Sequence, residues 1–405
     1  MLQHRITHDK PELLAPAGDM ERLEMALAYG ADAVYLAGSR FGMRASAGNF
    51  DRRQMEKAIA LAHGMGRRVY VTCNTLPRED ELNALPAFLE ELDGSADGLI
   101  IADMGVLALA RRYAPNTKLH VSTQMGVINS AAACALYEMG ADTVVLAREA
   151  SMEDIRKIRA NTPKELRLEA FVHGAMCVSF SGRCLLSNYL TGRDANRGEC
   201  AQPCRWSYSL MEEKRPGEYF PIVEDGGTYI MNSRDMRMIE HIPELLEAGI
   251  DSFKIEGRMK SAYYAAIITN AYRHGIDAAL RGEPLEPVWL EETEKVSHRP
   301  YCTGFYYDYP GQHYAQASYS TRADVAAVVE SCDGEGNAVL SQRNKFCAGD
   351  ELELVCPRGK PELFRAEHIY DSEGTEIEDT RHPMMEIHMR LPRPAPRLSI
   401  IRKCR

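Results

Sequence analysis

Short apolar segments alternate with longer amphipathic ones over about the first 280 residues of this chain, and no other feature limits its fold as strongly. The short segments have the length and the Val, Ile and Leu content of buried β-strands, and helical periodicity follows nearly all of them. Eight such units in succession predict an α/β fold, a closed (β/α)8 TIM-like barrel. The strand-like segments lie at residues 12–17, 33–37, 68–73, 98–102, 118–122, 143–147, 166–172 and 252–256.

A recurring turn supports this repeat. Residues 29–32 and 139–142 read Tyr-Gly-Ala-Asp and Met-Gly-Ala-Asp, and residues 247–251 are a looser copy. In each, a glycine that ends a helix is followed by an acidic turn before a strand, as expected of repeated βα units. A doubly wound open sheet is the alternative, but no Gly-x-Gly-x-x-Gly motif follows the first strand.

The character of the sequence changes near residue 321. From there, alternating apolar and polar residues with tight turns predict a small β-barrel or sandwich, as in residues 324–340 and 385–391. We therefore expect residues 1–320 to form the barrel, with a cysteine-rich insertion at about residues 174–230 after the seventh strand. Residues 321–405 are expected to form the β-domain. Such domains often bind oligonucleotides or act as lids, and one that only packs against the barrel is equally compatible with the pattern.

Composition and charge exclude some classes of protein. The N-terminal residues hold no apolar signal core, and no run approaches the roughly 18 apolar residues of a membrane span, so we expect a cytoplasmic protein outside the membrane. The formal net charge of −10 argues against a surface coated in nucleic acid, but it allows a local basic patch. Residues 381–405 hold seven Lys or Arg against one acid, Glu386, which suits a solvated tail or an RNA contact.

Four cysteines after the seventh strand carry the strongest chemical signal. Cys177, Cys184, Cys200 and Cys204 are spaced Cys-x6-Cys-x15-Cys-x3-Cys in a polar segment. The chain has eleven cysteines, which in a reducing compartment rarely form disulfides, and soft thiolates select zinc, copper(I) or iron–sulfur clusters. Structural zinc usually uses tighter pairs on both sides, so the wide spacing favours an iron–sulfur cluster. Zinc and four buried structural cysteines remain alternatives.

Charged and polar residues mark the ends of several predicted strands, where a (β/α)8 barrel assembles its site. His173 is a candidate acid or base, or a satisfied structural histidine. Glu256 and Arg258 are candidate catalytic residues, although their spacing also suits a simple ion pair. No Gly-x-Ser-x-Gly, His-Glu-x-x-His or Walker A motif is present, so the sequence shows none of these catalytic motifs of a serine or zinc peptidase. The predicted substrate-binding residues at strand ends are Glu12, Asn74, Gln124 and Lys254.

Several segments resemble peptidase family U32, the collagenase-like peptidases. They are ELLAPAG, EAFVHGAMCVSFSGRC, NRGECAQPCR, NSRD, DSFKIEGRMKS and QRNKF, which together span nearly the whole chain. The chain is most similar to a branch for which the resemblance implies oxygen-independent hydroxylation of wobble uridine in tRNA to 5-hydroxyuridine. It also implies a 4Fe–4S cluster as cofactor and prephenate as hydroxyl donor. Other branches imply hydroxylation of 23S ribosomal RNA or of a quinone precursor, and the family name implies a peptidase.

The resemblance also assigns residues. It places Cys177, Cys184 and Cys200 on cluster positions, and Cys204 becomes the expected fourth ligand because residues 232–237 hold no cysteine where some members have one. Prephenate is a dicarboxylate, which implies a clamp of His173, Lys254 and Arg258. A uridine must be presented as an unstacked base. Members that work in pairs imply a paralogue or a second copy as partner. The expected RNA contacts are Arg197, Arg205, Trp206 and the basic run of residues 381–405.

Overall fold

The computed structural model describes most of the chain as two compact units. One unit holds Met1–Met20, Asp32–Met259 and Arg299–Tyr319. The other holds Glu21–Ala31, Lys260–His298 and Ser320–Arg405. Its first two segments are helical and were predicted to belong to the barrel, but their contacts place them with the C-terminal residues. Side chains of residues 196, 205, 209–211 and 219–221 are not described. The described residues are 10–43, 49–177, 179–180, 184–206, 209–211, 219–221, 233–310 and 320–405.

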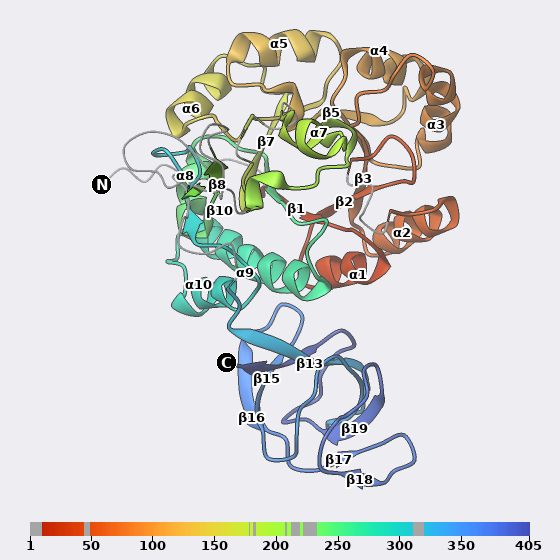
Figure 1. Ribbon diagram of the computed structural model, residues 1–405, viewed down its shortest axis with the longest axis vertical. Coiled ribbons are helices and arrows are strands. Elements are labelled where there is room, and N and C mark those ends of the chain that lie inside the picture. The colour runs from red at the N-terminus through yellow and green to blue at the C-terminus, as the bar shows by residue number, and fades with distance from the viewer. Residues whose placement is uncertain are drawn as a thin grey trace. The chain divides into compact units, whose positions relative to one another are not determined.

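Eight parallel strands of the first unit form the predicted closed barrel (Figure 1). Neighbours in sequence pair in order from β1 to β7, and β11 pairs with both β7 and β1, which closes the ring. Nearly all strand residues are buried, because a parallel sheet covered by helices has no solvent face. The strands are β1 (Glu12–Pro16), β2 (Ala33–Ala37), β3 (Arg68–Cys73), β4 (Gly98–Ile101), β5 (Lys118–Val121), β6 (Thr143–Val145), β7 (Arg167–Ala175) and β11 (Ser252–Ile255).

Helices between the strands begin at capping residues that the sequence supplies. Asp51 accepts from the backbone N–H of Gln54, whose side chain bonds back, and Ser151 and Asp154 form the same capping box. Such caps satisfy backbone donors that the first turn leaves unpaired, so each helix has a defined start. None of the helices in the described ranges is both long and apolar enough to cross a membrane. The helices of this unit are α2 (Arg52–Gly64), α3 (Leu85–Leu92), α4 (Met104–Tyr113), α5 (Ser130–Glu138), α6 (Met152–Ala160), α7 (Leu186–Thr191) and α8 (Ile242–Glu247).

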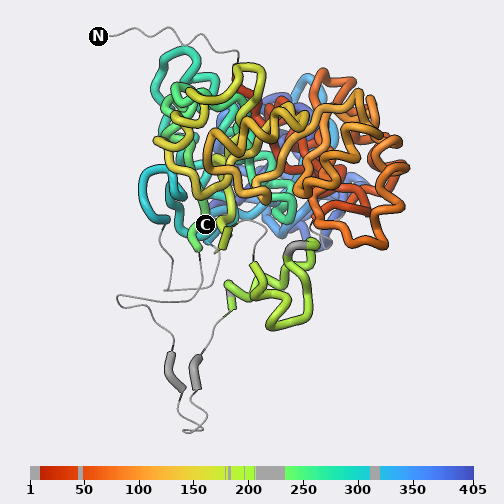
Figure 2. Tube along the Cα trace, turned by 90° about the horizontal axis from the view of Figure 1, so that it is seen from above, coloured from red at the N-terminus to blue at the C-terminus, as the bar shows by residue number. Residues whose placement is uncertain are grey.

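The cysteine-rich insertion follows β7, as predicted. β7 ends at Ala175, three residues beyond the predicted end at 172, because β10 (Asp235–Arg237) pairs with it antiparallel. β12 (Tyr301–Cys302) extends this edge, and β8 (Ser209–Met211) pairs antiparallel with β9 (Tyr219–Pro221). Figure 2 shows the segment around α7 beside the barrel.

The second unit combines three helices with an antiparallel sheet (Figure 1). The hydroxyl of Tyr29, just after α1 (Met20–Ala28), donates to the carbonyls of Val355 and Leu398, at 2.8 and 3.0 Å. The imidazole of His274, on α9 (Ala262–Arg281), stacks on Trp289 of α10 (Pro287–Glu294) with ring centroids 3.8 Å apart. The alternation seen in the sequence thus yields a β-domain with its own buried core.

Eight strands make up that sheet, in the order β16-β15-β20-β13-β14-β19-β17-β18. Residues 324–340, predicted to be part of this β-domain, include most of β13 and the start of β14, which pair antiparallel. Alternate residues of these strands enter the core, as the period of two in the sequence requires. The strands are β13 (Ala323–Cys332), β14 (Asn337–Gln342), β15 (Glu351–Val355), β16 (Pro361–Arg365), β17 (Ile369–Tyr370), β18 (Glu376–Ile377), β19 (Glu386–Arg390) and β20 (Ile400–Cys404).

A candidate active site lined by four cysteines

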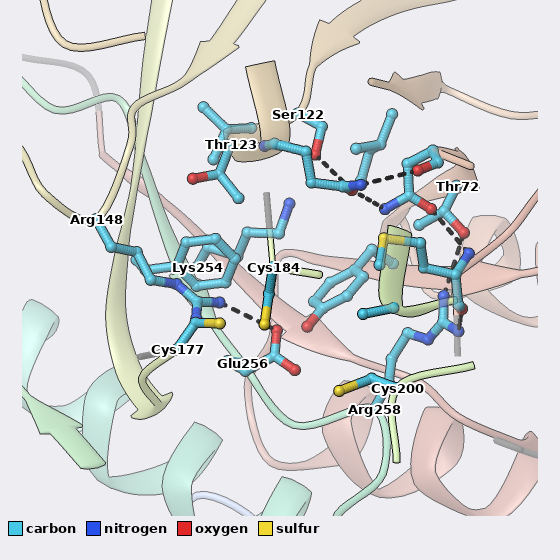
Figure 3. A pocket seen from close by; sticks show the side chains of 18 of the residues that line it. Thr72, Ser122, Thr123, Arg148, Cys177, Cys184, Cys200, Lys254, Glu256 and Arg258 are labelled. Atoms are coloured by element: carbon cyan, nitrogen blue, oxygen red, sulfur yellow. Dashed lines mark hydrogen bonds and ion pairs between the residues drawn. The ribbon is translucent and has the colours of Figure 1, made fainter. Parts of the chain in front are cut away.

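A cavity of about 170 Å³ lies at the carboxyl ends of the barrel strands, where (β/α)8 enzymes assemble their sites. This volume is space for on the order of ten waters, which suits a small ligand or one unstacked base. Its side chains come from several strands and from the insertion after β7 (Figure 3). The residues predicted at strand ends that do line it are Asn74, Gln124, Lys254, Glu256 and Arg258.

All four cysteines of the predicted cassette line this same cavity, none of them in a disulfide within the described residues, and Figure 3 shows Cys177, Cys184 and Cys200 around it. The backbone N–H of Gln202 points to Sγ of Cys200 at 3.4 Å, a contact that stabilises negative charge on sulfur. Across the described ranges, no three Cys, His, Asp or Glu side chains are close enough together to hold a metal ion. Four thiols are suitable donors for a thiolate-bound metal or cluster. Because the described ligating side chains are too far apart, binding would require the sulfur atoms to move closer together.

Lys254 brings a buried positive charge to the cavity. Its Nζ lies 4.8 Å from the ring centre of Tyr35 and 5.5 Å from that of Phe171, so aromatic faces border the ammonium group. Its counter-ion is Glu169, whose Oε1 is 2.7 Å from Nζ. The pair fixes the ammonium group of Lys254 where β11 ends.

Arg258 connects the segment after β11 to the loop after β2. Its Nη1 donates to Oγ1 of Thr72 at 3.2 Å. Its Nη2 donates to the carbonyl of Met43 and to Oδ1 of Asn49, the latter at 3.4 Å. These contacts orient the buried guanidinium of Arg258.

Arg148 is a cavity residue that the sequence analysis missed. Its guanidinium carbon lies 4.0 Å from the ring centre of Phe171, its Nη1 donates to the carbonyl of Ala175 at 2.9 Å, and its Nη2 lies 3.4 Å from Glu256. The side chain is 10% exposed, and its Nε has no hydrogen-bond partner in the described part of the chain. Arg148 directly follows the sixth predicted strand, so the rule that singled out the other strand-end residues would have found it.

Asn74 and Gln124 form a pair of amides at the cavity. Nδ2 of Asn74 donates to Oε1 of Gln124 at 2.8 Å, and Nε2 of Gln124 donates to the carbonyl of Asn74 at 3.0 Å. The hydroxyl of Ser122 donates to the same Oε1 at 3.1 Å, and Oδ1 of Asn74 accepts from the N–H of Met43. Two residues predicted from different strands are therefore held together by direct contact.

Glu12 lies apart from this group. It is the first residue of β1, at the amino end of the barrel, and it does not line the cavity. Its carboxylate accepts from the hydroxyls of Tyr70 and Ser252, at 2.7 and 3.1 Å, and pairs with Arg68 at 2.5 Å. Burial raises the pKa of the Glu12 carboxyl above its usual value, although nearby arginines act in the opposite direction. These contacts give Glu12 a place in the polar interior of the barrel.

His173 and Arg197 also lie outside the lining of the cavity. His173 is buried within the pairing of β7 with β10, and its ring centre lies 5.3 Å from that of Tyr301. Arg197 makes a two-pronged contact with Glu81, with N–O distances of 2.6 and 2.9 Å. Trp206 is 44% exposed, and the side chain of Arg205 lies outside the described residues. The carbonyl of His173 nevertheless accepts from the backbone N–H of Glu256, a cavity residue, at 2.9 Å.

The fold and this cavity define a (β/α)8-barrel enzyme whose site combines thiols, cations and amides. The chain belongs to peptidase family U32. Residues 18–316 match that family, and residues 321–402 match the peptidase family U32 C-terminal domain.

Three curated proteins are similar to this chain. tRNA hydroxylation protein P1 of Bacillus subtilis is 38% identical over 96% of this chain and 93% of its own length. tRNA hydroxylation protein P of Escherichia coli is 36% identical over 90% of each chain. The 23S rRNA 5-hydroxycytidine C2501 synthase of Escherichia coli is also 36% identical, over 73% of this chain and 45% of its own. The first two likenesses therefore extend over both matched domains.

Proposed function

We propose that this protein is a tRNA-modifying enzyme that hydroxylates the wobble uridine to 5-hydroxyuridine. In the proposed reaction prephenate supplies the hydroxyl group, molecular oxygen takes no part, and a 4Fe–4S cluster is bound by Cys177, Cys184, Cys200 and Cys204. Relatives named for tRNA hydroxylation match 90% or more of this chain, which supports RNA hydroxylation as the activity. A tRNA substrate would also place the enzyme in the cytoplasm.

The observation that carries the proposal is the convergence of four cysteine side chains with cationic side chains on one cavity. When bound there, an iron–sulfur cluster supplies redox or Lewis-acid chemistry. Arg148, Lys254 and Arg258 line the same cavity, and their positive charges suit the two carboxylates of prephenate. Zinc would use the same four sulfur atoms but has no redox chemistry.

The amide pair provides a means of holding the base. Asn74 and Gln124 each carry donor and acceptor atoms, as does the edge of a uracil ring. Their present contacts with each other and with Ser122 hold both side chains in fixed orientations. A flipped uridine would exchange part of these bonds for its own, while the rings of Tyr35 and Phe171 supply apolar lining.

The cluster is tested by anaerobic purification with iron and sulfide analysis, for which we expect about four irons per chain. Cys184→Ser should lower bound iron, whereas the matched variant Cys134→Ser, on α5 and away from the cavity, should not. A protein with one zinc and no iron would contradict the cluster.

The reaction is tested by mass spectrometry of tRNA from a strain that lacks the gene. We expect 5-hydroxyuridine to be absent, and to return with the wild-type protein or Cys134→Ser but not with Cys184→Ser. Unchanged 5-hydroxyuridine in the deletion strain would sink the proposed reaction. New unmodified positions in ribosomal RNA, or a missing quinone, would instead assign one of the other hydroxylation substrates.

A collagenase-like peptidase, the activity in the family's name, has less support from the site. Cysteine peptidases pair their nucleophile with a histidine base. In the described part of the chain no histidine lines the cavity, and His173 is buried in strand pairing instead. Among the described residues, a cysteine thiol in the cavity therefore has no histidine beside it to act as the base for peptide cleavage.

A further inference from the structure

The basic run of residues 381–405 is largely neutralised by ion pairs within the second unit. Its six paired members include Arg402, which is fully buried against Glu292 and Glu353. Arg390 differs, because it is exposed and has no ion-pair partner among the described residues. The run as a whole is therefore no phosphate-binding strip. The six pairs are Arg381–Asp379, Arg393–Glu362, Arg397–Glu24, Arg402–Glu292, Lys403–Asp350 and Arg405–Asp324.

Arg390 belongs to the outward side of the C-terminal sheet. On β19, Ile387 and Met389 enter the buried core, and the residues between and after them, His388 and Arg390, face outward. His388 lies opposite Tyr370 of the neighbouring strand β17, so their side chains share one side of the sheet. This outward side therefore carries a guanidinium next to two rings.

A groove runs over this outward side to the end of β16. Its lining includes the rings of Phe364, His368, Tyr370 and His388, all exposed or half-buried. The rings of His368 and Tyr370 lie nearly parallel, at an angle of 27°, with centroids 6.5 Å apart. Arg390 lines the groove as well. Aromatic faces beside a cation are what an unpaired nucleotide strand requires.

A second guanidinium joins this groove from β16. Nε of Arg365 donates to the carbonyl of Gly349 at 2.9 Å, which orients the side chain. In the described ranges Arg365 makes no ion pair, although Glu351 lies opposite it on β15. Arg365 and Arg390 therefore add two cations to a groove lined with rings.

We propose that this groove binds a single-stranded segment of RNA. Its bases would stack on Tyr370 and the neighbouring rings, and its phosphates would contact Arg365 and Arg390. The inference rests on the proposed function in one respect, since tRNA supplies the strand. It adds a binding site on the β-domain that is separate from the cysteine-lined cavity.

Among the charged residues that line the groove, Arg365 and Arg390 outnumber the one acid, Glu367. Glu376 and Glu386 are held by His368 and His388, at 2.6 and 3.0 Å, and Glu367 lines the groove against two arginines. The rings of His368, Tyr370 and His388 have polar edges, which suit stacked bases better than the apolar side chains of a protein partner. Stacking is tolerant of sequence, so the groove would hold a strand without selecting the modified base.

The test is binding of a fluorescently labelled single-stranded oligouridine to the full chain, measured by fluorescence anisotropy at several salt concentrations. Tyr370→Ala should weaken binding on the order of tenfold. Arg390→Ala should weaken binding and reduce the slope of log affinity against log salt by about one. The matched control is Arg405→Ala, an exposed arginine outside the groove that is paired with Asp324. It should bind like the wild type.

The outcomes separate this site from the hydroxylation reaction. Tyr370→Ala and Arg390→Ala should bind as much iron as the wild type, because no residue of the groove lines the cysteine cavity. Wild-type affinity in both Tyr370→Ala and Arg390→Ala would overturn the proposal, as would an equal loss in Arg405→Ala. If a labelled peptide binds the chain and Tyr370→Ala weakens that binding to the same extent, the groove would be assigned to a protein partner instead. If Tyr370→Ala lacks a cooperative thermal transition, Arg390→Ala decides the result.

Discussion

Gly174 runs so close to Glu256 that a Cβ on Gly174 would lie 2.6 Å from the carbonyl oxygen of Glu256. Gly174 also has a φ of +112°, a conformation that other residues rarely adopt. The close approach joins β7 to the segment after β11, between the cysteine insertion and the charged cavity residues. Glycine at position 174 therefore sets where Glu256 lies relative to Arg148.

Gly174→Ala should lower the free energy of unfolding by about 2–4 kcal/mol, because it combines an unfavourable φ with a backbone clash. Gly192→Ala is the control: its φ of +69° lies near the left-handed helical region, which other residues enter at a smaller cost than a φ of +112°, and a Cβ there meets nothing within 4 Å. It should cost only about 1 kcal/mol. Urea denaturation of both variants measures the difference, and equal losses would show that the contact with Glu256 has no energetic weight.

The buried pair of Lys254 and Glu169 leads to a second prediction. Their side chains are 5% and 0% exposed, so removal of one partner leaves an uncompensated charge in the barrel. Glu169→Gln should cost about 3–5 kcal/mol of stability in urea denaturation. Lys157→Met, which breaks the exposed pair with Glu153, should leave the stability nearly unchanged. A comparable loss in the two variants would contradict the role assigned to burial.

The barrel was predictable because its evidence is local. Each strand is a short apolar run bounded by turns, and strands such as β2 and β3 match their predicted ranges in full. The end of β7 was not predictable, since its last three residues pair with β10, some 60 positions away in sequence. Pairing between distant segments leaves no periodic signal in either segment.

The site was predicted in part for the same reason. A strand-end rule found Asn74 and Gln124 but also selected Glu12, which begins its strand and so lies at the opposite end of the barrel. The sequence gives the direction of each strand, so it separates Glu12, which begins a strand, from residues that follow one. Applied in this way, the rule also selects Arg148. The ion pairs that neutralise the basic run, such as Arg397 with Glu24, join distant segments and could not be read from charge alone.

Arg148 should determine the affinity for prephenate, the proposed hydroxyl donor. It is held over Phe171 with an unpartnered Nε, so its charge and direction are set before a ligand arrives. Arg148→Ala should raise the KM for prephenate on the order of tenfold to a hundredfold, and Arg148→Lys should recover part of this because it restores charge without the planar fork. Steady-state kinetics at saturating tRNA measure both. An unchanged KM in Arg148→Ala would exclude a direct contact with prephenate.

The stability of the second unit should depend on pH through Glu353. Burial acts to raise the pKa of Glu353, but the charges of Arg402 and Lys295 and their hydrogen bonds outweigh it, so the pKa lies below its usual value of 4.5. Because the pKa is depressed in the folded state, the stabilisation is fully present above pH 4.5 and is lost as the pH falls through the lower folded value.

Glu353→Gln tests this dependence directly. The variant should be less stable than the wild type at neutral pH, because Arg402 and Lys295 lose a charged partner at 2.6 and 2.9 Å. The difference between the two proteins should shrink as the pH falls below 4.5, since the wild-type carboxylate then takes up a proton. Urea denaturation at a series of pH values measures it, and Glu351→Gln, at an exposed position of the same strand, should change stability by less than about 0.5 kcal/mol at every pH. A difference that stays constant down to acid pH would mean that the Glu353 carboxylate does not supply this stabilisation.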